Sequence, residues 1–287
     1  MSIRILTDSN CDLPSDIIHD YDIDVLPILI CLGDKEYEDG ITIDSYEVYK
    51  NMKQGSVYKT AQIPPNEFKK KFRQCADNKE TCIYIAFSSG LSGTYQSSIL
   101  AKNEIQEEYP DLDVTVIDTK CACMGQGLVV LKAAKMAKEG RSKEEILEAV
   151  KFYSEHMEHI VTVEDLEYLY RGGRVSRTSA FIGGLLNVKP IIDVRDGKLV
   201  PFEKLRGRNK VIKRIMDIVD ERGKSLEKQT IAIAHADDLE TAIKIKEMIE
   251  ERFKCRDILI TVMGCAIGSH VGPGTVAVFF LNEESPI

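Results

Sequence analysis

The sequence has no tryptophan, no apolar run long enough to cross a membrane, and fewer basic than acidic residues. A transmembrane helix needs about 20 predominantly apolar residues, and the N-terminal segment lacks the apolar core of a secretory signal. The net charge is −8, whereas a protein that binds the phosphate backbone of nucleic acids needs a basic face. We therefore expect a cytoplasmic protein with no membrane span and no nucleic-acid partner.

The eight cysteines lack the spacing of a metal site. Only Cys121 and Cys123 are close together, and no second pair exists to complete a zinc site. Cys31, Cys82 and Cys265 lie in or beside apolar runs, where cysteine serves as a small core residue. We expect free thiols, no bound metal and no cofactor.

The order of the predicted elements indicates an α/β fold. The chain of 287 residues is long enough for two domains, and its 44% hydrophobic and 29% charged residues are typical of a globular protein. Up to residue 158 apolar strands alternate with helical patterns, which predicts a mostly parallel sheet with helices on both faces. Beyond residue 160 the pattern changes, and Asp196-Gly197 marks a hairpin.

Several segments carry more specific expectations. Residues 24–30 are predicted to form one strand, in which Pro27 indicates an edge or early position. Residues 178–186 are predicted to form a short apolar helix, and residues 264–274, which are rich in Gly and Pro, a shaped loop. His156 and His159 are expected at the surface or at a helix end, as cations. Asp8 and Ser9 either cap the next helix or reach a ligand.

An anion site is expected at residues 88–94, Ser-Ser-Gly-Leu-Ser-Gly-Thr, which join a buried strand to a helix. The first N–H groups of a helix have no intrahelical partner and its dipole is positive there, which suits a phosphate or a carboxylate. Ser88, Ser89, Ser92 and Thr94 add hydroxyl donors. No Gly-Lys-Ser/Thr follows, so the turn is not a P-loop. In the simpler interpretation, Ser92 or Thr94 merely caps the helix.

Two further residues are candidates for a site. Thr60 lies in an extended loop before Pro64 and Pro65, and by pattern alone it is an ordinary loop residue. His270 is the only titratable residue of residues 264–274, whose five Gly and Pro residues specify the backbone around it. A Ser/His acyl hydrolase or transferase stays open, although the chain has no Gly-x-Ser-x-Gly elbow and no carboxylate evidently placed behind His270.

Five motifs, which follow one another along nearly the whole chain, resemble those of the DegV family of bacterial fatty-acid-binding proteins. They are Thr-Asp-Ser at 7–9, Lys-Thr-Ala-Gln at 59–62, Ser-Ser-Gly-Leu-Ser-Gly-Thr-Tyr at 88–95, Gly-Arg-Val-Ser at 173–176 and His-Val-Gly-Pro-Gly-Thr at 270–275. The family pattern around the threonine is usually Thr-Ser-Gln-Pro. Here Ala61 replaces the serine, and Ile63 stands in place of the proline, with Pro64 one position later.

The resemblance implies a binding protein and not an enzyme. It implies an N-terminal α/β domain over residues 1–158, a C-terminal α+β domain over residues 159–287, and a tunnel between them for one long-chain fatty acid. The carboxylate is expected at Thr60 and Ser92, with His270 close by. The other residues expected at the ligand are Ser89, Gly93 and Arg174. Phe181, Ile182, Leu185 and Leu186 are expected either as tunnel walls or as ordinary core.

The resemblance also implies a protein partner, a fatty acid kinase. The kinase would convert the presented carboxylate into an acyl phosphate for phospholipid synthesis, and Arg206 is the expected docking residue. Burial of a long acyl chain at ~0.8 kcal/mol per methylene supplies roughly 10 kcal/mol before the costs of ordering the ligand, so no catalytic group is needed for binding. Besides the hydrolase, a binder of a phosphate ligand remains an alternative.

Overall fold

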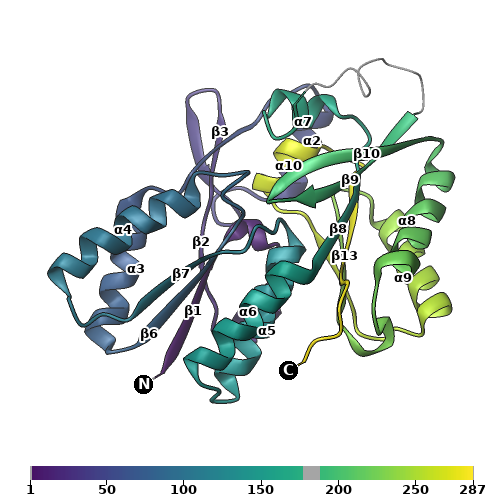
Figure 1. Cartoon of the computed structure of the whole chain (residues 1–287). Coiled ribbons are helices and arrows are strands. Elements are labelled where there is room, and N and C mark those ends of the chain that lie inside the picture. Colours follow the sequence, from purple (N-terminus) through teal and green to yellow (C-terminus); the bar gives the residue numbers. More distant parts are fainter. Residues whose placement is uncertain (1, 177–187, 287) are drawn as a thin grey trace.

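A computed structural model describes residues 2–176 and 188–286 (Figure 1). The predicted apolar helix at 178–186, with Phe181, Ile182, Leu185 and Leu186, lies outside the described residues. Within the described ranges, no helix combines the length and the apolar character that a membrane span requires.

A four-stranded parallel sheet forms the centre of the N-terminal half, in the strand order β2-β1-β6-β7. Its strands are β1 (Ile3–Asp8), β2 (Asp24–Leu26), β6 (Thr81–Ala86) and β7 (Val114–Asp118). One face is covered by α3 (Pro65–Asn78) and α4 (Thr94–Glu108), and the other by α5 (Met124–Lys138) and α6 (Lys143–His156) (Figure 1). Every residue of β6 is buried, as expected for a central strand with helices on both sides.

A small antiparallel sheet, β4-β3-β5, corrects the prediction of one strand at 24–30. Its strands are β3 (Leu29–Leu32), β4 (Lys35–Glu38) and β5 (Lys59–Ala61). Pro27 lies between β2 and β3, where its missing N–H interrupts the ladder, and the chain passes to the second sheet. Thr60 consequently lies in β5, opposite Ile30, and not in a loop.

The C-terminal half contains a six-stranded mixed sheet, in the strand order β10-β9-β8-β13-β11-β12. Its strands are β8 (Met157–Thr162), β9 (Val188–Arg195), β10 (Lys198–Arg206), β11 (Ile231–His235), β12 (Ile258–Val262) and β13 (Val276–Leu281). The outer face is covered by α8 (Arg208–Arg222) and α9 (Leu239–Phe253), with which it forms a core of its own (Figure 1). The predicted fold class, α/β with a parallel N-terminal sheet and a C-terminal α+β half, is confirmed.

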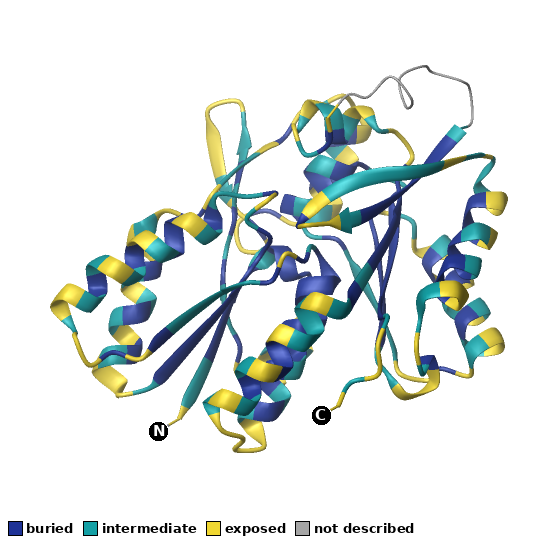
Figure 2. Cartoon of the chain, in the orientation of Figure 1, coloured by how far each residue is buried: buried dark blue, intermediate teal, exposed yellow. Residues whose placement is uncertain are grey.

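The inner face of this sheet shares a hydrophobic core with the N-terminal half (Figure 2). The core joins Ile83 of β6 to Val130 of α5 and to Phe279 of β13. The sequence of α5 is apolar around most of its circumference because the helix packs between the two sheets. The predicted boundary after residue 158 lies inside β8.

The remaining elements are short and lie mostly around the junction of the two halves. They are the 3₁₀ turns η1 (Ser9–Cys11) and η2 (Leu226–Lys228) and the helices α1 (Ser15–Asp20), α2 (Ser45–Lys53), α7 (Glu167–Arg171) and α10 (Cys265–Val271). The prediction that residues 264–274 form only a loop is wrong, because residues 265–271 form α10. Gly268 is needed for packing and not for a turn, since a Cβ at this position would lie 2.4 Å from the hydroxyl oxygen of Tyr49.

Candidate functional site

A cavity of about 270 Å³ lies between the six-stranded sheet and the N-terminal half. Most of its lining is apolar, and it includes Phe87, Leu91, Val161, Ile192, Leu199 and Phe279. None of the described residues that line the cavity is Asp or Glu. The cavity therefore suits an apolar ligand, and its polar part suits an anion better than a cation.

The structure brings five of the six predicted ligand residues to this cavity. They are Thr60, Ser92, Gly93, Arg174 and His270. The sixth, Ser89, is not among the lining residues. Its N–H donates to Asp118 Oδ1 at 3.1 Å, and its hydroxyl accepts from Lys120 Nζ at 2.6 Å. Arg206 is exposed at the end of β10 and is also absent from the cavity wall.

Two of the lining residues, Thr60 and His270, form a direct hydrogen bond, with 2.8 Å between Oγ1 and Nε2. Burial, together with the positive charge of Arg174, lowers the pKa of His270 to about 3, so the imidazole is neutral at pH 7. Gly172 allows this ring position, because a Cβ there would lie 2.3 Å from Nδ1. The neutral imidazole can give up its hydrogen bond to Thr60 and bind a ligand oxygen instead. No charge of the ring is then buried in addition to that of the ligand.

The turn at residues 88–94 adds a hydroxyl, that of Ser92, to the lining of the same cavity. Ser92 Oγ accepts from the N–H of Thr94 at 3.2 Å and lies 2.9 Å from Thr94 Oγ1, so it both supports the start of α4 and lines the cavity. A Cβ on Gly93 would lie 2.0 Å from Oε1 of Gln62. Glycine at this position thus leaves room for the side-chain amide of Gln62 against the turn.

Arg174 supplies a permanent positive charge, and it is the one Lys or Arg among the described lining residues. Its Nε donates to the carbonyl of Leu91 at 3.2 Å and its Nη1 to the carbonyl of Gly172 at 2.6 Å. Burial lowers its pKa, but an arginine stays charged at any physiological pH. These two bonds hold the guanidinium between the turn at 88–94 and the end of α7.

Two buried carboxyl groups from the N-terminal half hold the first turn of α10. Asp39 accepts from the N–H groups of Cys265 at 2.9 Å and Ala266 at 3.3 Å, and Asp12 accepts from that of Gly264 at 2.8 Å. Burial raises the pKa of both carboxyls, that of Asp12 to about 8. Ser9, a candidate ligand or cap, donates instead to Asp39 at 2.9 Å. No local pattern in the sequence indicates this role for either aspartate.

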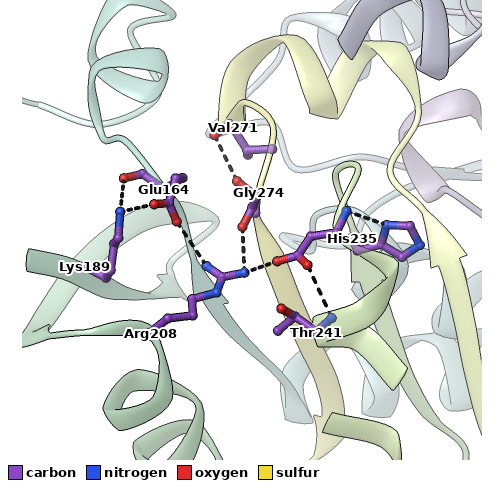
Figure 3. A network of polar contacts seen from close by, with 9 residues as sticks. Glu164, Lys189, Arg208, His235, Thr241, Val271 and Gly274 are labelled. Atoms are coloured by element: carbon purple, nitrogen blue, oxygen red, sulfur yellow. Dashed lines mark hydrogen bonds and ion pairs between the residues drawn. The ribbon is translucent and has the colours of Figure 1, made fainter. Parts of the chain in front are cut away.

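A polar network fixes the chain after α10, as Figure 3 shows. Arg208 at the start of α8 donates to the carbonyl of Gly274 at 2.7 Å and to Asp238, and it pairs with Glu164, which also binds Lys189. The hydroxyl of Thr275 donates to the carbonyl of Val271 at 3.0 Å. The helix that carries His270 is thus tied at both ends to distant segments.

His159 is a lining residue that the sequence analysis assigned to the surface, and that prediction is wrong. It is 3% exposed in β8, and burial lowers its pKa to about 4. Its Nε2 accepts from the N–H of Ala122 at 3.1 Å, and its Nδ1 donates to the carbonyl of Met157 at 3.1 Å. Side chains two residues apart in a strand share a face, so His159 lies on the same face as the apolar Val161. This alternation in the sequence could have indicated that His159 is buried.

The chemistry of the site favours binding over hydrolysis. His270 has no carboxylate among the hydrogen-bond partners that the described residues supply, so the third member of a hydrolytic triad is missing. The described part of the chain also contains no cluster of side chains that could hold a metal ion, and its eight cysteines are free. Two hydroxyls, a neutral imidazole and one guanidinium beside an apolar cavity can instead hold a carboxylate with an apolar tail.

Comparisons with known proteins agree with this description. The model of the DegV family, described as "Uncharacterised protein, DegV family", matches residues 2–283. A DegV domain-containing protein of Clostridium perfringens is 42% identical over 282 residues, which cover 97% of each chain.

Solved structures give the same result. A fatty-acid-binding DegV family protein from Thermus thermophilus has a TM-score of 0.89 at 29% identity, over 97% of this chain and 99% of its own. DegV of Bacillus subtilis, described as a fatty acid binding protein, has a TM-score of 0.86 at 31% identity, over 97% of this chain and 98% of its own. On the extent of the family match and the identity to its relatives, this chain belongs to the DegV family.

Proposed function

We propose that this protein binds one long-chain fatty acid in the cavity and presents its carboxylate to a fatty acid kinase. One observation carries the proposal: Thr60, Ser92, Arg174 and His270 line a mostly apolar cavity whose described lining has no acidic residue. The names of the Thermus thermophilus and Bacillus subtilis relatives, both fatty-acid-binding, support the same ligand.

In the proposed complex, the hydroxyls of Thr60 and Ser92 donate to the two carboxylate oxygens. Because the one proton of the Thr60 hydroxyl is then used, His270 carries its proton on Nε2 and donates from there, and the charge of Arg174 offsets the cost of burying an anion. The acyl chain lies against the apolar wall, where each buried methylene contributes ~0.8 kcal/mol. The protein acts as a carrier, and the chemistry belongs to the kinase.

The proposed partner surface is the segment 204–210, which spans the end of β10 and the start of α8. Arg206 is exposed there, whereas Arg208 is held by the network around Gly274. In a chain with a net charge of −8, a local basic segment favours docking to an acidic surface of the kinase. The kinase would then transfer a phosphoryl group from a nucleoside triphosphate to the fatty acid carboxylate.

The test of the ligand is mass spectrometry of the purified protein, first native and then denatured, with identification of the released molecules. We expect one fatty acid per chain in the native mass and a free fatty acid after denaturation. A protein that is empty and also fails to take up added fatty acids contradicts the proposal. Assays with acyl esters and with phosphorylated metabolites would then decide between the hydrolase and the phosphate binder.

A further inference from the structure

This inference rests on the proposed function and concerns the far end of the acyl site. The strand that follows α10 runs away from His270, and its residues Ala277 and Phe279 line the cavity. Ala277 pairs with Val161 of β8, and Phe279 pairs with His159. Side chains two residues apart share a face of a strand, so these pairs form two successive rows, about 7 Å apart.

The two rows continue across the neighbouring strands. Val161 pairs with Ile192 of β9. The antiparallel register of β8 and β9 therefore places His159 opposite Val194. Val194 pairs with Leu199 of β10. The near row consists of Ala277, Val161 and Ile192. The far row consists of four side chains on four strands, and its two rings replace Ala277 and Val161 on β13 and β8: Phe279, His159, Val194 and Leu199.

A second hollow lies beyond the far row. It is a polar groove of about 440 Å³, whose lining includes Thr119, Lys120 and Asn282. His159 and Val194 line both the cavity and this groove. These two side chains therefore separate the apolar site from the groove.

The imidazole of His159 is suited to a wall and not to a ligand contact. Both ring nitrogens are occupied by backbone groups, those of Ala122 and Met157. The ring packs edge-on against Phe279, with 5.4 Å between the centroids. Gly125 lies so close that a Cβ there would be 2.1 Å from Nε2. A ring held on these sides presents only its carbon edge and face to a ligand.

We propose that His159 and Val194 form the end wall of the acyl site and thereby set the longest fatty acid that the protein binds. A chain that fits stops at the far row. A longer chain has to displace a packed imidazole or fold back on itself. Loss of either side chain joins the cavity to the groove and extends the site.

The test measures the affinity of the full-length protein, stripped of lipid, for saturated fatty acids that increase by two carbons at a time. For the wild type, each added methylene raises the affinity roughly fourfold until the wall is reached, after which the affinity falls. In His159→Ala and Val194→Ala the maximum moves to chains longer by about two carbons or more. Val200→Ala is the matched control, because Val200 follows Leu199 in β10 and points to the other face.

The outcomes separate this inference from the function on which it rests. If the wild type binds no fatty acid of any length, the proposed function fails. If the wild type binds fatty acids but both variants keep its maximum, His159 and Val194 do not limit the chain, and the inference is overturned. If His159→Ala does not fold, because the N–H of Ala122 loses its acceptor, Val194→Ala decides alone.

Discussion

The hydroxyl of Ser92 is held locally by the backbone and side chain of Thr94, and it still reaches the cavity wall. We predict that Ser92→Ala weakens fatty acid retention by about tenfold or more, because a hydrogen bond to a charged group contributes roughly 1.5–3 kcal/mol. The fold should persist, since Ser92 is only partly buried. The measurement is the rate of fatty acid release to an acceptor vesicle.

Ser89→Ala is the control for Ser92→Ala, because Ser89 binds Lys120 away from the cavity. Equal release from the Ser92 variant and the wild type would contradict the role of Ser92.

The buried His159 makes the stability of the folded protein depend on pH. Burial lowers its folded-state pKa from the ordinary 6.5 to about 4, so between these values the unfolded chain binds a proton that the folded chain does not. The contribution of His159 to stability is therefore present above about pH 6.5 and declines as the pH falls towards 4, by on the order of 3 kcal/mol. We predict that the stability advantage of the wild type over His159→Asn is smaller at pH 4.5 than at pH 7.5. Denaturant unfolding at the two pH values measures it, and a constant difference would contradict the buried, neutral state of the ring.

The sequence motifs named most of the polar residues that line the cavity, but not the buried residues that hold those side chains in place. The family motifs identified Thr60, Ser92, Arg174 and His270, all of which the structure places at the cavity. They also identified Ser89, which binds Asp118 instead. Asp39 escaped notice, because its partners in α10 lie more than 220 positions away along the chain. A contact at such a separation depends on tertiary packing, which no local pattern reports.

At the scale of elements, α10 carries His270, and its first turn depends on a residue from another part of the chain. We predict that Asp39→Ala costs about 1–3 kcal/mol of stability and lowers fatty acid affinity, because two buried N–H groups lose their acceptor. Asp39→Asn should be intermediate, since its amide keeps one acceptor oxygen. Thermal unfolding and fatty acid titration together measure both effects.

The control for Asp39 is Ser142→Ala, which removes the capping box of α6. Its loss should cost about 1 kcal/mol of stability without changing fatty acid affinity, because Ser142 is exposed and does not line the cavity. If Asp39→Ala binds fatty acid as tightly as Ser142→Ala does, α10 does not need this anchor to position His270.

Local signals predicted some elements well and others poorly. The capping box at Ser142 and the Asp196-Gly197 hairpin both appear as predicted, because the residues that specify them are neighbours in sequence. The helix α10 was missed because five of the residues 264–274 are Gly or Pro, which argue against helix by propensity, although only Gly268 of them lies inside α10. Gly268 is tolerated because the close approach of Tyr49, which the glycine permits, outweighs its helix cost.

At the scale of the whole molecule, one hydrophobic core runs from the parallel sheet through α5 to the inner face of the six-stranded sheet. The alternation of strands and helices predicted both halves, but not the way in which they share this core. The site is a consequence of that junction. Thr60 and Ser92 come from one half, His270 and Arg174 from the other, and the cavity exists only where the two meet.

The exposed edge of the molecule at the end of β10 is where we expect the kinase to dock. We predict that Arg206→Glu leaves fatty acid binding unchanged, because Arg206 is exposed and absent from the cavity wall. Acyl phosphate formation by a fatty acid kinase, at kinase concentrations below saturation, should fall by about tenfold or more, since a reversed charge repels an acidic partner.

The matched control is Arg256→Glu, an exposed arginine just before β12, at the opposite edge of the sheet. If the two reversals slow the kinase equally, the effect belongs to net charge and not to a docking surface. A slower reaction for Arg206→Glu alone, with a salt dependence weaker than that of the wild type, would place the partner at this edge.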